Sequence, residues 1–198
     1  MADLRSILGV IAGVITFLAF VPYIISTVKG DTKPERATWF IWAVVGFLLL
    51  TSYHYSGAVS TIWAAVTYFI GPLIVALISV KYGVGGWSVL DKVCLSGAAV
   101  SLILWYVTKS APVALYINIL VDFLGLIPTI VKTYNNPSSE SRLSWSMSTI
   151  GNFVNLLAIN RLTLSIIIFP AYFLLNTGTI LLLILFRGSR KFKNVYAK

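Results

Sequence analysis

The sequence predicts an all-α membrane protein of seven transmembrane helices, built as two related three-helix units joined by a single linking helix. Composition is the first reason, since 58% of the 198 residues are hydrophobic, only 11% are charged, and the mean hydropathy is +0.90. A soluble domain carries about 25% charged residues, so a lipid bilayer is the expected environment of this chain. The spacing of the apolar segments and an internal similarity are the other two reasons.

Seven apolar segments are long enough to cross the hydrocarbon core of a bilayer, which takes roughly 20 residues of helix. They are predicted at 6–28, 37–55, 58–80, 88–107, 111–133, 142–160 and 163–186. Gly, Pro, Asn and charged residues, which favour turns, occupy the interruptions between them. Arg5 is the one basic residue before the first segment, and that segment is longer than the core of a signal peptide, so we expect it to be retained as a helix.

Lysine and arginine are distributed unequally between the two ends of the predicted bundle. Arg5, Lys109 and Arg161 fall on the side of the N-terminus, and the other twelve of the 15 fall on the opposite side. Because cytosolic loops are enriched in Lys and Arg, we expect a multi-pass protein of the plasma or inner membrane with its N-terminus outside and its C-terminus in the cytosol. The basic segment 187–198 would then lie on anionic headgroups.

An offset of 106 residues aligns the first half of the chain with the second. It pairs Pro22 with Pro128 and Trp39 with Trp145, among other identical residues, and solubility in lipid alone does not require these pairs. Three helices reverse the direction of the chain, so one further crossing is needed for two parallel repeats, a 3+1+3 plan. The expected parts are a first repeat, a linking helix, a second repeat and a basic cytosolic tail, at 1–84, 85–108, 109–186 and 187–198.

Two segments resemble copies of the PQ-loop motif, each a proline-led stretch followed by a Ser/Thr-Trp pair and an apolar run: 22–33 with Thr38-Trp39, and 128–137 with Ser144-Trp145. The chain is therefore similar to the PQ-loop superfamily, which includes the SWEET sugar transporters, lysosomal amino-acid exporters and fold relatives that carry nicotinamide riboside. The resemblance covers nearly all of the chain outside the linking helix. It implies a SWEET-like fold with the motif loops facing the cytosol.

The chain departs from that motif at one position in each copy. The glutamine that should follow the proline is Tyr23 in the first copy and Thr129 in the second, so no role of that glutamine carries over. The prolines do carry over, and an interior proline removes one backbone hydrogen bond and weakens a helix locally. Pro22 and Pro128 lie less than two turns from the predicted cytosolic ends, where family members are thought to flex as an inner gate. We expect them to act as hinges, with a static kink as the alternative.

Asp122 is the acidic residue predicted to lie deepest in the bilayer. It is about eleven residues into the fifth apolar segment, close to the midplane at about 1.5 Å of rise per residue. Ionisable groups at this depth are costly and tend to mark functional sites. A carboxyl group there can bind and release a proton, so we predict that Asp122 couples solute movement to a proton gradient. The alternative is a carboxyl group that only holds helices together through hydrogen bonds.

Four asparagines also fall at central depths, and carboxamides suit hydroxyl- or amide-bearing solutes because they both donate and accept hydrogen bonds. Together with two aromatic residues that would stack on a ring, they are the candidate substrate-binding residues: Asn118, Asn152, Asn155, Asn176, Trp42 and Tyr68. In SWEET-type transporters an asparagine of the last helix flanks the solute, and Asn176 is placed where the resemblance puts that residue. Hydrogen bonding between helices is the alternative role for all four asparagines.

The sequence favours a transporter of a small polar solute, such as a sugar, an amino acid, a nucleoside or a vitamin-like compound, with alternating access to a site between two three-helix bundles. A seven-helix receptor, or a sorting or sensor protein of the same fold, is the alternative. One His, one Cys and one central Asp offer no catalytic arrangement, so we expect no enzyme, no cofactor and no metal. The expected partners are the lipid bilayer and the solute, with no nucleic acid, in a monomer or a homo-oligomer.

Overall fold

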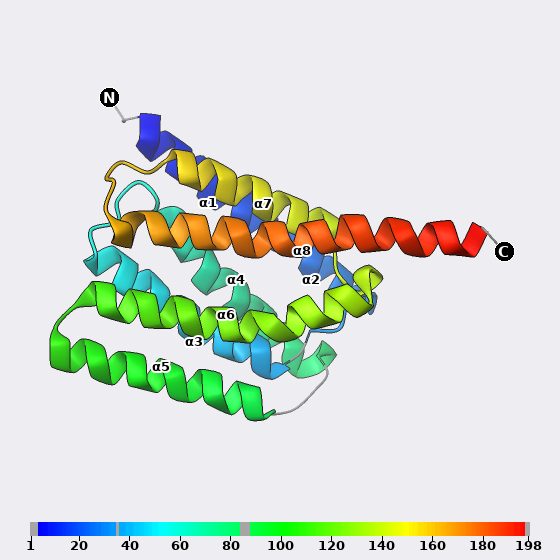
Figure 1. The fold of residues 1–198 in the computed structure, drawn as a ribbon, viewed down its shortest axis with the longest axis horizontal. Helices are drawn as coiled ribbons and strands as arrows, with labels where there is room; N and C mark the ends of the chain where they lie inside the picture. Colours follow the sequence, from blue (N-terminus) through cyan, green and yellow to red (C-terminus); the bar gives the residue numbers. More distant parts are fainter. Residues whose placement is uncertain (1–3, 35, 84–87, 197–198) are drawn as a thin grey trace.

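The computed structural model describes residues 4–34, 36–83 and 88–196, and within them the chain is helical with no strand. The prediction of an all-α protein is confirmed. The helices, with one short 3-10 turn, are α1 (Leu4–Leu18), α2 (Phe20–Lys29), α3 (Arg36–Tyr55), α4 (Ile62–Tyr82), α5 (Val89–Thr108), α6 (Ala111–Asn135), η1 (Pro137–Ser139), α7 (Arg142–Leu157) and α8 (Leu164–Tyr196). They run up and down one elongated bundle (Figure 1).

Four stretches of helix among the described residues are long and apolar enough to cross a membrane. They are Leu4–Lys29, Ile62–Tyr82, Ala111–Asn135 and Leu164–Phe186. Large apolar side chains are exposed along the outside of the bundle on every long helix, including Val14, Leu77, Ile103, Leu120 and Leu175. An apolar surface of this extent is expected where lipid, rather than water, surrounds a protein. Both observations support a membrane protein.

The helices pack in two groups of three, with α5 at the edge. In the first group α4 packs against both α1 and α3, and in the second α8 packs against both α6 and α7. The groups meet along two seams, where α1 lies against α7 and α3 lies against α6. The linking helix α5 lies beside α6 on the outside of the bundle (Figure 1). The seams therefore bring the two halves of the sequence face to face.

Glycines permit close approach of α4 and its preceding turn to α1 and α3. A Cβ atom on Gly9 would collide with the backbone of Ser60, and one on Gly46 would collide with the backbone of Tyr68. Small residues at helix contacts are the usual means of close packing in membranes, where apolar burial alone does not favour helix association. These glycines hold the first three-helix group tightly together.

Proline has different effects at its two predicted hinge positions. The first long helix is interrupted at Ala19, so that α1 ends at Leu18 and α2 begins at Phe20. Pro22 has no N–H to donate to the Leu18 carbonyl, and its ring crowds that carbonyl, which explains the break. In contrast, α6 continues through residue 128, whose side chain lies outside the described residues. The backbone is thus interrupted in the first half and continuous at the matching place in the second.

The last helix is longer than the predicted apolar segment. α8 continues to Tyr196, so residues 187–196 extend the helix instead of forming a separate tail, and the helix projects beyond the bundle (Figure 1). The side chains of these residues, and hence their predicted contact with headgroups, lie outside the described residues. The other helix ends agree with the predicted segments to within about four residues.

Candidate functional site

A cavity of about 80 Å³ lies between the two three-helix groups. This space would hold roughly three water molecules, at about 30 Å³ of liquid volume each. Its walls come from α2, α3, α4, α6, α7 and α8, and they are mostly apolar. The lining side chains that can form hydrogen bonds through an oxygen or an amide are Tyr68, Asp122, Ser144, Ser148, Asn176 and Thr177, with Tyr23 closer to the end of the bundle.

Asp122 and Asn176, two of the predicted site residues, meet on the wall of this cavity. Tyr172, one turn before Asn176 on α8, donates a hydrogen bond of 2.7 Å to Oδ2 of Asp122. The Asn176 amide approaches the same Oδ2 atom at 3.5 Å and the Tyr172 hydroxyl at 3.5 Å. Neither bond uses Oδ1 of Asp122. The carboxyl group is therefore positioned by α8 through one of its oxygens and can bind a ligand through the other.

Tyr68 and Asn152 form a second polar contact between the halves. The Asn152 amide nitrogen donates to the Tyr68 hydroxyl at 2.5 Å and to the Ser148 carbonyl at 3.0 Å, and it lies 3.4 Å from Oγ1 of Thr177. Tyr68 lines the cavity, with its ring stacked on Phe173 at 3.9 Å between centroids. Asn152 is fully buried and does not line the cavity, and its contact with the cavity wall is the hydrogen bond to the Tyr68 hydroxyl.

Trp42 lines the cavity from α3 as part of a run of aromatic side chains. Its ring centroid lies 5.2 Å from that of Trp39, and Trp39 lies 5.0 Å from Tyr23. The Trp42 indole reaches α6 where Gly125 leaves room, because a Cβ atom on that glycine would lie 2.9 Å from Nε1. Among the described residues this buried Nε1 atom has no hydrogen-bond partner. The indole N–H of Trp42 is therefore a donor without a described partner, and it lies next to α6, the helix that carries Asp122.

Asn118 and Asn155 are not among the residues that line the cavity. Both are fully buried, and neither the oxygen nor the nitrogen of either carboxamide has a hydrogen-bond partner among the described residues. They lie closer than Asp122 and Asn152 to the end of the bundle that carries Lys109. In this conformation they are separated from the space that a solute would occupy.

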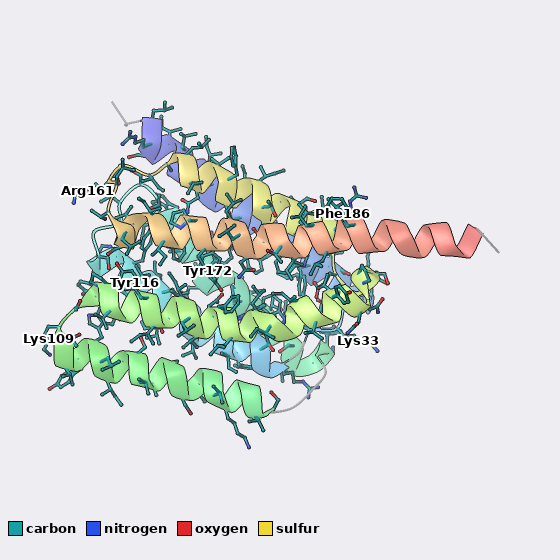
Figure 2. The ribbon with its side chains drawn as sticks, viewed as in Figure 1. Lys33, Lys109, Tyr116, Arg161, Tyr172 and Phe186 are labelled. Carbon is teal, nitrogen blue, oxygen red and sulfur yellow. The ribbon has the colours of Figure 1, made fainter. Side chains whose placement is uncertain are left out.

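Aromatic packing closes the bundle between the cavity and the Lys109 end. The Tyr53 ring stacks on Phe169 at 4.5 Å between centroids. Its hydroxyl donates to the Ile166 carbonyl at 2.9 Å and lies 2.6 Å from Oγ1 of Thr61. Tyr53 and Phe169 are fully buried. The cavity therefore extends only in the other direction, towards the first turns of α3 and α7 and the end where Lys33 lies (Figure 2).

The predicted hinge at Pro22 adjoins the cavity. Ala19, Phe20 and Tyr23, which surround the helix break, all line it. Tyr23 is the residue that stands where the PQ-loop motif has glutamine. Ser144 and Trp145 at the start of α7 also line the cavity, and the 106-residue offset pairs them with Thr38 and Trp39 of α3.

Sequence reasoning missed Tyr172 and the aromatic side chains around Tyr23. Tyr172 precedes Asn176 by four residues, and residues at this spacing share one face of a helix, so the signal for it was present. Thr177 and Phe173 could be assigned to the cavity only from the rotation of α8 about its axis, which the structure shows.

Comparison with protein-family models, with curated proteins and with solved structures gives no match to this chain.

Proposed function

We propose that this protein is a multi-pass membrane transporter of a small polar solute, with seven spans in a 3+1+3 parallel repeat similar to that of the PQ-loop superfamily. The observation that carries the proposal is the cavity between the two three-helix groups. Both halves of the sequence line it, and Asp122 and Asn176 bring polar groups to an otherwise apolar wall. A polar site at the interface of two repeats is where transporters of this kind bind their solutes.

The pattern of helix contacts supports the proposed repeat. The 106-residue offset relates α1 to α6, α3 to α7 and α4 to α8. Each contact within the first group has a counterpart in the second, because α4 packs against α1 and α3 as α8 packs against α6 and α7. The contact of α1 with α7 likewise corresponds to the contact of α6 with α3. All six contacts are present, and this correspondence supports the proposed relation between the two halves.

Alternating access follows from the closure of the bundle at one end. With the proposed topology, the aromatic cluster of Tyr53 and Phe169 lies on the outer side of the cavity, and the interrupted helix at Ala19 lies on its inner side. The structure then corresponds to a state closed to the outside. Movement of α2 about the break would change the inner side of the cavity, because Phe20 and Tyr23 form part of its wall.

Asp122 is the proposed proton-coupling residue. Its carboxyl group lines the cavity and is in contact with Tyr172 and Asn176 of α8, so a change in its protonation alters groups on a different helix. An intramembrane carboxyl group placed in this way is typical of proton-coupled transporters.

The proposal is tested with purified protein in lipid nanodiscs. Its thermal stability is screened against sugars, amino acids, nucleosides and vitamins at acidic and at neutral pH, and each stabilising compound is then tested for uptake into proteoliposomes. A ligand that binds the folded state raises the unfolding midpoint. We expect Asn176→Ala to abolish stabilisation, and Asp122→Asn to abolish its dependence on pH.

Two outcomes would contradict the proposal. A compound that binds the cavity but is never taken up would instead support a receptor or sensor of the same fold. Binding of no compound at either pH, with Asn176→Ala and Asp122→Asn both as stable as the parent, would argue against a solute site in the cavity.

A further inference from the structure

The charges around the cavity suggest which class of solute it takes. Among the described residues, Asp122 is the one acidic residue that lines the cavity, and no described Lys, Arg or His lines it. An ionised carboxylate in a low-dielectric interior needs a positive partner, since its desolvation is otherwise very costly. Within the described part of the chain, the groups that donate to this carboxyl group are the neutral Tyr172 and Asn176.

The unused oxygen of Asp122 provides the place for such a partner. Both hydrogen bonds to the carboxyl group end on Oδ2. A carboxylate offers about four acceptor positions on its two oxygens, so Oδ1 keeps its acceptor positions for a ligand in the cavity. A bound cation would complete the environment of this carboxylate, whereas an anion or a neutral solute would leave the carboxylate without a positive partner.

The other residues of the cavity wall favour an organic cation over a metal ion. Hard cations such as Ca²⁺ are usually held by several carboxylates among six or more oxygen ligands, whereas the other oxygen-bearing side chains of this wall are neutral hydroxyl and amide groups, and the described residues hold no cluster of three or more acidic, His or Cys side chains. It has instead a wall of aromatic rings from Tyr23, Trp39, Trp42 and Trp145. The face of an aromatic ring attracts a weakly hydrated cation, most strongly in the case of Trp.

We propose that the solute of this cavity is a small organic monocation, an amine or quaternary ammonium compound, whose charge pairs with Asp122 among the rings of Trp39 and Trp42. The inference rests on the proposed function and narrows it to one class of solute. A consequence is that the solute and a proton compete for the same carboxylate, so that one would be exchanged for the other during transport.

The experiment compares cations with neutral molecules of the same shape. Choline and its uncharged isostere 3,3-dimethylbutan-1-ol, together with benzyltrimethylammonium, are titrated into the protein in nanodiscs at neutral pH, with binding followed by thermal stability and tryptophan fluorescence. We expect the two cations to bind and the uncharged alcohol not to bind. Asp122→Asn should weaken the cations by roughly tenfold or more.

Matched variants separate the charge and the rings from general damage to the fold. Asp31→Asn makes the same chemical change in an exposed acid outside the cavity and should bind like the parent. Trp42→Phe should retain most of the affinity, and Trp42→Leu should lose roughly fivefold. The unfolding midpoints of the variants without ligand show whether each one is folded.

The inference is overturned if the alcohol binds as well as choline, if Asp122→Asn folds and keeps the parent's affinity, or if neither cation binds. If neither cation binds but a neutral solute from the wider screen stabilises the protein and is taken up, the proposed transport function is retained and only the class of solute is wrong. Failure of every compound in both experiments would remove the proposed function as well.

Discussion

At Asn118 and Asn155 two carboxamides are fully buried with no hydrogen-bond partner among the described residues. A buried polar group without a partner costs about 1–3 kcal/mol relative to a satisfied one. Membrane transporters tolerate such a cost where the group is used in another conformation. Both residues lie on the closed, Lys109 side of the cavity, so opening of that side would expose them to a solute or to water.

Asn118→Leu is expected to stabilise the closed conformation. Leucine has a similar size and no polar atoms, so the substitution removes the cost of burying an unpaired amide, about 1–3 kcal/mol. The measurement is the unfolding midpoint in detergent, which should rise, together with the uptake rate of the transported solute, which should fall. A lower midpoint would instead show that the amide has a partner, such as a buried water molecule.

At the scale of a helix, the break at Ala19 predicts the behaviour of Pro22→Ala. The substitution supplies an N–H that can donate to the Leu18 carbonyl, so α1 and α2 should merge into one straighter helix. We expect a midpoint equal to or above that of the parent and a several-fold lower uptake rate, because movement about the break is lost.

Pro112→Ala is the control for that experiment. Pro112 lies in the first turn of α6, where a backbone N–H has no partner within the helix, so its replacement should change neither stability nor uptake appreciably. Equal uptake by Pro22→Ala and the parent would contradict the hinge.

Close helix packing predicts unequal effects of alanine at two glycines. At Gly9 a Cβ atom would meet the backbone of Ser60, which cannot move aside as a flexible side chain can, so Gly9→Ala should separate α1 from the turn before α4 and lower the unfolding midpoint by several degrees. At Gly178 a Cβ atom would enter open space. Gly178→Ala should therefore be neutral or slightly stabilising, by up to about 1 kcal/mol from helix propensity. Similar losses for both variants would contradict this account of the packing.

At the scale of the whole molecule, the proposed topology places Lys109 and Lys33 on opposite sides of the membrane. The two residues lie at opposite ends of the bundle (Figure 2). In a chain whose natural cysteine is removed by Cys94→Ala, Lys109→Cys should react with a membrane-impermeant maleimide in intact cells. Lys33→Cys should react only after permeabilisation. The reverse pattern would invert the topology, and reaction of both in intact cells would place both residues on the outer side, which contradicts the odd number of crossings predicted between them.

The helices and the candidate polar residues could be predicted from the sequence because hydropathy and length are local properties. Runs of apolar residues located α4, α6 and the start of α8 to within about four residues. The depth of Asp122 followed from its position along one helix, and the structure places Asp122 on the cavity wall. The break near Pro22 was also predictable in kind, since the missing N–H is a property of proline itself.

Helix rotation and packing decided which polar groups meet, and a single sequence does not determine these. Asn152 and Asn176 were both predicted solute ligands, with Asn176 favoured by the resemblance, and Asn152 donates to Tyr68 behind the wall while Asn176 lies on the cavity beside Asp122. Tyr172 reaches Asp122 across 50 positions of sequence. The sequence alone determined that the chain is helical, apolar and supplied with a few deep polar residues. Only the tertiary structure decided which of them share a site, because burial and hydrogen bonding depend on neighbours that other helices bring.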